Sequence, residues 1–173
     1  MIADLSLAQA LGFVSFGLGI STFYQKNDRR LKIVMFVFNL NHLLHFILLG
    51  SAVSALSAAL SAMRTASSIY TSSKYVAAIF LLAGAGLGLY IADHWWDLWP
   101  VIGTMIGTFA IFMLRGIQMR IAFLIGACCW LTNNILVGSI GGTLLELTVI
   151  TVNSLTIFRM LREQKRALAS QAL

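Results

Sequence analysis

The chain has very little charge for its length. Of its 173 residues, 10% are charged and 59% are apolar, whereas soluble globular proteins carry about 25% charged residues. Long stretches contain no lysine, arginine, aspartate or glutamate at all. Such runs are typical of membrane-spanning helices, so the sequence predicts an integral membrane protein and not a soluble domain.

Proline, cysteine and catalytic patterns are also scarce. Pro100 is the only proline, so the apolar runs have no proline hinges, and the two cysteines, Cys128 and Cys129, are adjacent. Because neighbours in a helix point in different directions, we interpret this pair as small core residues and not as a redox or metal site. Gly-x-Ser-x-Gly, Walker and His-Glu-x-x-His patterns are missing. We therefore expect no catalytic residue, no metal and no cofactor.

Charges, glycines and Pro100 divide the chain into apolar segments close to the length of a membrane span. A spanning helix needs about 20 apolar residues. The first segment is followed by further spans and not by a cleavage site, which argues against a signal peptide. We predict an all-α membrane protein with seven transmembrane helices, at residues 5–24, 31–49, 52–71, 75–91, 101–114, 120–137 and 142–161.

The predicted loops alternate in charge. The segments QKNDRRLK and RGIQMR, Lys74 and the tail after residue 161 fall on one side of a seven-span bundle, whereas the loop ADHWWDLWP falls on the other with two aspartates. The positive-inside rule then predicts an outside amino terminus and a cytoplasmic carboxyl terminus. The net charge of +6 reflects these cytoplasmic loops, so we expect no nucleic-acid partner.

The chain contains two similar halves. A shift of 88 residues aligns residues 17–70 with 105–158 without a gap, and LLHFILLGS at 43–51 matches LTNNILVGS at 131–139 with five identities in nine. Turns and buried polar positions fall into register as well. Two three-helix units joined by one helix must be parallel. We predict a first repeat at 1–73, a linker helix and outer loop at 74–97, a second repeat at 98–161 and a basic cytoplasmic tail at 162–173.

Two resemblances follow from these features. The 3+1+3 order with an outside amino terminus resembles the SWEET sugar transporters and their PQ-loop and PnuC-type relatives, although the proline-glutamine pair and the span prolines are missing. The segments FYQKNDRR and NHLLHFILLGSAVSALSAALSAMR resemble the bacterial inner-membrane YgjV-like family, in which a basic loop precedes a histidine, a Leu-Leu-Gly turn and an arginine. His42 or His45, Gly50 and Arg64 match these positions. This resemblance implies a multi-pass protein of the bacterial inner membrane.

Arg64 lies near the middle of the third predicted span. A central arginine costs about 2.5–3.5 kcal/mol on insertion scales, and Ser57, Ser61 and Ser68 share its helical face. We therefore expect it to face the bundle interior. Two interpretations remain open: Arg64 binds a solute, or it holds the bundle together by pairing with Glu146 or with backbone carbonyls.

Further polar and aromatic residues lie in the second, sixth and seventh predicted spans. We expect Trp130, Asn133 and Asn153 to bind the solute together with Arg64, Asn153 from the opposite repeat. Asparagines in spans also hydrogen-bond simply to neighbouring helices. Both interpretations stay open for Asn133 and Asn153.

His42, His45 and Glu146 are predicted to line the outer entry or to relay protons. Histidine suits a relay because its usual pKa lies near neutrality. The alternatives are satisfied interior histidines and a His/His/Glu metal site.

Glycines recur at helical spacing in the fourth and fifth predicted spans. Gly84 and Gly88, and Gly103 and Gly107, form Gly-x-x-x-Gly patterns that allow close helix packing. The same smooth faces would also let one three-helix unit rock against the other.

These observations predict a transporter in the lipid bilayer that moves a small polar or anionic solute by alternating access between the two repeats. A non-transporting receptor or assembly protein is the alternative, with the basic tail around residues 159–166 docking a partner or anionic lipid. An intramembrane enzyme with a titrating His45 and Glu146 pair is a third. The sequence leaves open whether the protein forms a homo-oligomer.

Overall fold

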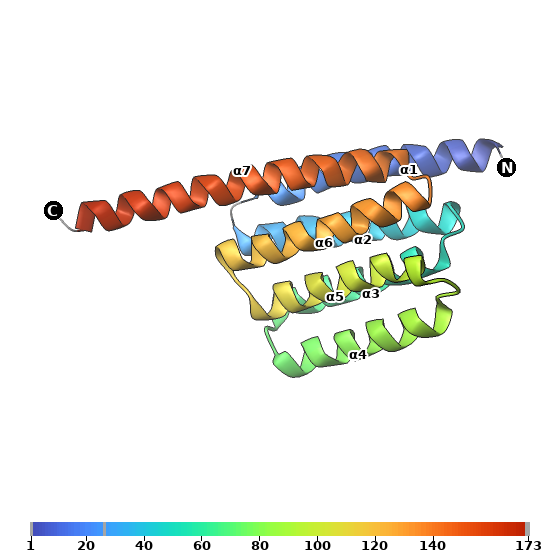
Figure 1. The fold of residues 1–173 in the computed structure, drawn as a ribbon, viewed down its shortest axis with the longest axis horizontal. Helices are drawn as coiled ribbons and strands as arrows, with labels where there is room; N and C mark the ends of the chain where they lie inside the picture. Colours follow the sequence, from blue (N-terminus) through green and yellow to red (C-terminus); the bar gives the residue numbers. More distant parts are fainter. Residues whose placement is uncertain (1, 26, 172–173) are drawn as a thin grey trace.

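The computed structural model is built from antiparallel helices (Figure 1). It describes residues 2–25 and 27–171, with side chains described for 7–25 and 27–166. Within these ranges there is no strand. The seven α-helices are α1 (Ile2–Tyr24), α2 (Asp28–Leu48), α3 (Ala52–Tyr70), α4 (Lys74–Ile91), α5 (Leu98–Met113), α6 (Gly116–Leu136) and α7 (Ile140–Gln171), with a short 3-10 turn, η1 (Trp95–Asp97), before α5.

The seven predicted segments are confirmed as helices. Among the described residues, six helices are long and apolar enough to cross a membrane, and α3 is the one outside this set. Its serines and Arg64 make it too polar, although 19 residues is nearly the length of a span. The predicted tail continues α7 as a helix through Gln171, while residues 172–173 lie outside the described part.

The turns follow directly from local sequence. Gly50 in the α2–α3 turn has a φ of 73°, and Gly138 in the α6–α7 turn has a φ of 69°. Glycine adopts this left-handed conformation without steric cost. Asn27 begins α2 by accepting a hydrogen bond from the backbone N–H of Arg30 at 3.0 Å, as an N-cap residue does. These short connections force consecutive helices to run antiparallel.

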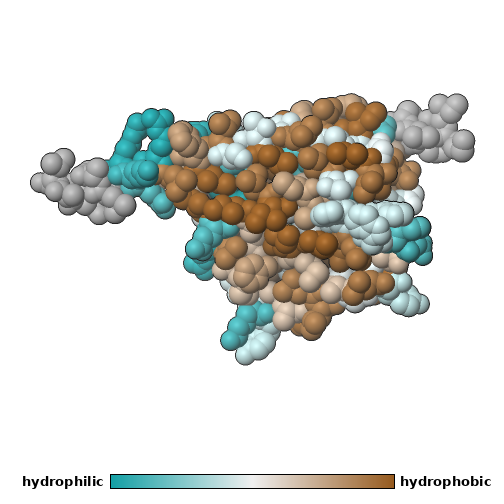
Figure 2. All heavy atoms as spheres, viewed as in Figure 1, coloured by the Kyte–Doolittle hydropathy of each residue, from teal (hydrophilic) through white to brown (hydrophobic). Residues whose placement is uncertain are grey.

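The outside of the bundle is apolar. Large side chains such as Leu82, Leu89 and Ile125 are exposed on its flanks, and Figure 2 shows hydrophobic residues across the middle with hydrophilic residues towards the two ends. This is the surface expected against lipid. Cys129 is buried but Cys128 is exposed, so the interpretation of both cysteines as core residues is wrong for Cys128.

Six of the helices form a closed ring of contacts. Around the ring, α1 packs on α2, α2 on α3, α3 on α5, α5 on α6, α6 on α7, and α7 returns to α1. The fourth helix lies outside the ring, against α3 and α5. Two of the contacts around the ring, α1–α7 and α3–α5, therefore join the first half of the chain to the second.

Glycines allow several of these helices to approach one another closely. A Cβ on Gly141 of α7 would clash with the backbone of Gly12 in α1, so the two backbones touch there. A Cβ on Gly88 of α4 would lie 2.6 Å from a methyl group of Val101 in α5, whereas one on Gly84 would meet only Leu60, at 3.8 Å. Close packing through glycine is thus required at Gly88, while an alanine would fit at Gly84.

Replacement of Gly88 by alanine should loosen the α4–α5 contact. Val101 is β-branched and stiff, so we expect Gly88→Ala to lower the free energy of unfolding by about 1–3 kcal/mol, as overpacking does. Gly86→Ala is the matched control, because nothing lies within 4 Å of a Cβ there and alanine favours a helix over glycine. Thermal unfolding of the purified protein in detergent measures both, and equal midpoints for the two variants would contradict the packing described.

Candidate functional site

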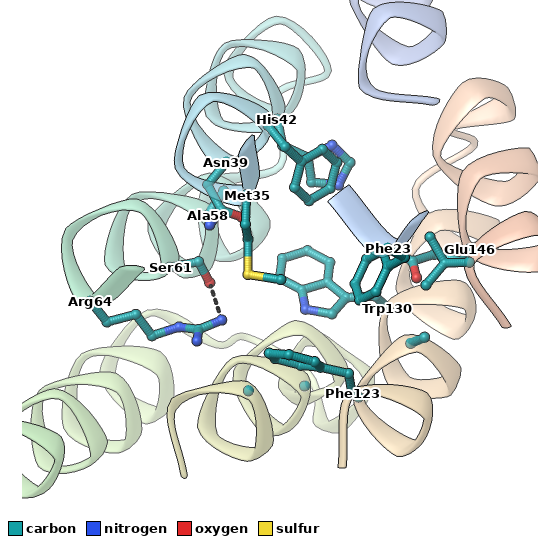
Figure 3. Close-up of a pocket in the computed structure, with 16 residues that line it drawn as sticks. Phe23, Met35, Asn39, His42, Ala58, Ser61, Arg64, Phe123, Trp130 and Glu146 are labelled. Carbon is teal, nitrogen blue, oxygen red and sulfur yellow. Dashed lines mark hydrogen bonds between the residues drawn. The ribbon is translucent and has the colours of Figure 1, made fainter. Parts of the chain in front are cut away.

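A cavity of about 60 Å³ lies at the centre of the helix ring. Each of the six ring helices contributes to its lining, and no described residue of α4 does so. Figure 3 shows side chains from several helices converging on this space. The polar and aromatic lining includes Phe23 of α1, Asn39 and His42 of α2, Ser61 and Arg64 of α3, Phe123 and Trp130 of α6, and Glu146 of α7.

The guanidinium of Arg64 lies at one side of this cavity and is buried, with 5% of the residue exposed. Its Nη2 lies 3.4 Å from the Ser61 hydroxyl, the long bond marked in Figure 3. Within the described part of the chain, Nε and Nη1 have no hydrogen-bond partner. The predicted pair with Glu146, and the alternative pairing with backbone carbonyls, are not formed. The predicted polar stripe is correct, since Ser57, Ser61 and Ser68 are buried with Arg64.

The two glycines of α5 make room for cavity side chains. A Cβ on Gly107 would lie 2.7 Å from Arg64 Nη2, and a Cβ on Gly103 would lie 2.8 Å from Trp130 Cδ1. Gly103 also faces the backbone oxygen of Gly126 in α6, so it serves helix packing as predicted. Gly107 differs, because its missing side chain leaves space for a cation and not for a helix backbone.

Glu146 lies on the side of the cavity away from Arg64, with Trp130 drawn between the two in Figure 3. The residue is 6% exposed. No hydrogen bond or ion pair joins its carboxylate to another described residue. The cavity therefore contains one guanidinium and one carboxyl group, separated by aromatic rings, and no described residue is a counterion for either.

His42 is surrounded by aromatic rings. Its ring centroid lies 4.6 Å from that of Phe46 and 5.8 Å from that of Trp130. One nitrogen, Nδ1, is 3.0 Å from the Ser15 hydroxyl, whereas Nε2 is buried without a partner among the described residues. Of the two predicted histidines, His42 is the one that the structure brings to the cavity.

His45 is instead satisfied at both nitrogens. Its Nδ1 lies 2.7 Å from the carbonyl oxygen of Ala8, which can only accept, so Nδ1 carries the proton. Its Nε2 accepts from the Ser139 hydroxyl at 2.7 Å, and that oxygen accepts from the backbone N–H of Gly142 at 3.0 Å. This chain of bonds ties α2 to α1 and α7. The geometry favours the structural interpretation of His45, and the residue does not line the cavity.

The two predicted asparagines also lie away from the cavity. Asn153 is fully buried and donates to the carbonyl oxygen of Arg120 at 2.7 Å. Asn133 accepts from the Ser54 hydroxyl at 3.0 Å and lines a separate hollow. Neither meets the Arg64 guanidinium, because the depth of a residue along its helix does not fix the direction in which its side chain points. Both act as links between helices.

Two buried polar residues, Asn39 and Arg120, were not identified from the sequence. Asn39 lines the cavity and donates to the Thr65 hydroxyl at 3.2 Å; its position three residues before His42 on the same helical face was an available signal. Arg120 is fully buried and donates to the carbonyl oxygen of Gln25 at 2.8 Å. A cation at the start of an apolar run normally indicates a loop, so burial of Arg120 had no sequence signal.

The two ends of the bundle have hollows of opposite charge. One is lined by Arg29, Lys32 and Arg115 with Asp28, and the other by Asp93 and Asp97 with no basic residue. Within the described part of the chain, no group of three or more histidine, cysteine, aspartate or glutamate side chains is placed to hold a metal ion. The His/His/Glu alternative therefore has no geometric support.

Comparison with known proteins agrees with the helical, apolar character of the chain. A family described as "Bacterial inner membrane protein" (Imp-YgjV) matches residues 6–164. The chain is 40% identical over 162 residues to the inner membrane protein YgjV of Escherichia coli (strain K12), which covers 94% of this chain and 88% of that protein. No solved structure matches.

A structural role for His45 predicts a loss of stability on its replacement. We expect His45→Phe to lower the free energy of unfolding by about 1–3 kcal/mol, because the Ala8 carbonyl then lacks its buried partner. Leu44→Phe is the control, since Leu44 is exposed on the outside of the same helix. Thermal unfolding in detergent compares them, and a His45→Phe midpoint equal to that of the wild type would contradict the structural role.

Proposed function

The chain belongs to the family of bacterial inner membrane proteins, and we propose that it moves a small polar or anionic solute across that membrane through the central cavity. The observation that carries this proposal is the buried guanidinium of Arg64, whose Nε and Nη1 have no partner among the described residues. The fold by itself assigns no activity. The proposal therefore rests on the chemistry of the cavity.

An unsatisfied buried cation is costly to maintain. A charge near the bilayer centre costs about 2.5–3.5 kcal/mol on insertion scales, and guanidinium donors that lack acceptors add to that cost. A role confined to holding helices together would be served by a carboxylate or carbonyl partner, and Arg64 has neither. A carboxylate or other oxygen-rich group of a solute would supply the missing acceptors.

We further propose that all seven helices span the membrane as two parallel three-helix repeats. The ring of contacts supports this, because each contact made by one repeat has a counterpart made by the other. If α1, α2 and α3 correspond to α5, α6 and α7, then the contact α1–α2 corresponds to α5–α6 and α2–α3 corresponds to α6–α7. The contact α1–α7 likewise corresponds to α3–α5, and all six contacts are present. A polar helix such as α3 is compatible with a span when neighbouring helices cover its polar face. The solute then lies between the repeats, as in other transporters built from repeats.

Alternating access requires the two halves to move at the contacts that join them. One such contact is the backbone approach of Gly12 and Gly141, and the other places Arg64 against Gly107. Beside the first, Leu145 of α7 packs on Gly19 of α1 and His45 bonds to Ala8 and Ser139, so side chains as well as backbone join the halves there. The second lies at the cavity, where movement of α5 relative to α3 would change access to Arg64.

Arg64 should be required for solute recognition and not for folding. We expect a metabolite that raises the unfolding midpoint of the wild-type protein to have no effect on Arg64→Gln, because a neutral amide cannot neutralise an anionic group. Screening the purified full-length protein against a metabolite library finds such a compound. Arg159→Gln, the same change at an exposed position, is the control. Uptake of the labelled compound into proteoliposomes then distinguishes a transporter from a receptor.

Two results would contradict the proposal. One is the absence of any library compound that stabilises the protein in an Arg64-dependent way. The other is a compound that binds in this way but is not moved across proteoliposomes, which would favour the receptor alternative.

We also propose an outside amino terminus and a cytoplasmic carboxyl terminus. This orientation places the basic hollow with Arg29 and Arg115 in the cytoplasm and the aspartates of the α4–α5 loop outside.

Cysteine labelling tests this orientation. In a Cys128→Ser and Cys129→Ser background, a membrane-impermeant maleimide should label Asp93→Cys in spheroplasts, whereas Ser72→Cys should react only after the membrane is opened. The reverse labelling pattern would contradict the orientation.

A further inference from the structure

We propose that the solute is a small zwitterion, with its anionic group at Arg64 and its ammonium group at Glu146. This inference rests on the proposed solute site and specifies the chemistry of the molecule that occupies it. It depends on a second observation, independent of Arg64, which is the carboxylate of Glu146 on the other side of the same cavity (Figure 3).

The charges of the lining favour a zwitterion over an anion. Two of the described side chains that line the cavity have a formal charge, Arg64 and Glu146. These two formal charges cancel. A solute with one negative charge would pair with Arg64 but leave the buried Glu146 carboxyl without a partner, which is costly. A zwitterion keeps the site neutral and gives each buried group a counterion.

The region between the two charges is apolar and aromatic. Trp130, Phe23, Phe123 and Met35 line the cavity, and Figure 3 shows Trp130 between Arg64 and Glu146. This wall suits the methylene groups of a solute and, through ring faces, an ammonium group.

The cavity also limits the size of the solute. A cavity of about 60 Å³ is larger than a single water molecule needs, which is roughly 10–15 Å³, but it is still small, so we expect a solute of the size of a short amino acid. Glycine, β-alanine and γ-aminobutyrate are of this kind and increase the distance between ammonium and carboxylate one methylene at a time.

Matched pairs of compounds isolate the contribution of the ammonium group. Propionate, butyrate and pentanoate have the same number of non-hydrogen atoms as glycine, β-alanine and γ-aminobutyrate, with a methyl group in place of the ammonium group. Affinities are measured on the purified full-length protein by isothermal titration calorimetry, supported by shifts of the unfolding midpoint. We expect at least one zwitterion to bind at least tenfold more tightly than its carboxylate counterpart.

Variants at Glu146 test the assignment of the ammonium group. Glu146→Gln, which is close in size and uncharged, should remove the preference for the zwitterion and leave the affinity for the carboxylate counterpart within about threefold of wild type, which is under 1 kcal/mol. Glu146→Asp keeps the charge and should keep the preference. The comparison in the wild-type protein requires no variant, so it remains decisive even if Glu146→Gln does not fold.

Three results would overturn this inference. They are equal binding within each pair, stronger binding of the carboxylates, and no binding of any of the six compounds. A preference for the zwitterion that survives in Glu146→Gln would also overturn the assignment to Glu146. These failures are distinguishable from failure of the transport proposal, because a different Arg64-dependent compound from the metabolite library, moved into proteoliposomes, would leave that proposal intact.

Discussion

The polar face of α3 must be kept away from lipid, and the arrangement of the other helices meets that requirement. Arg64 lies on this face with Ser57, Ser61 and Ser68, all buried. A single neighbouring helix cannot cover such a face, and α3 has three neighbours, α2, α4 and α5. The cost of exposing a guanidinium to lipid is consistent with the position of α3, the described α-helix outside the set of candidate spans, between three neighbouring helices.

Enclosing Arg64 creates the cavity, because its guanidinium needs space that a close-packed interior would not leave. That space comes from Gly107, where a Cβ would lie 2.7 Å from Arg64 Nη2, so that the guanidinium would have to move. Trp130, which lies between Arg64 and Glu146 in Figure 3, is accommodated in the same way by Gly103. One Gly-x-x-x-Gly pattern therefore accommodates a charged and an aromatic side chain, in addition to any helix packing.

Much of the fold was predictable from sequence, and much less of the site. The helices follow from runs of apolar residues broken by charge, glycine and Pro100, since span length is a one-dimensional property. Burial of Arg64 followed from its cost. The positions of Asn153 and His45 did not, because both lie at suitable depths but point to Arg120 and Ser139. Side-chain direction depends on the rotation of each helix about its axis, and packing against every neighbour determines that rotation.

The place of α4 outside the ring has a consequence for how the sequence can evolve. Its buried residues are Ala77, Gly84 and Gly88, all small, and the rest of the helix has some exposure to its surroundings. Selection on the cavity cannot act on side chains that do not reach it. Changes among the exposed side chains of α4 therefore leave the cavity lining unaltered, provided that small residues remain where the helix meets α3 and α5.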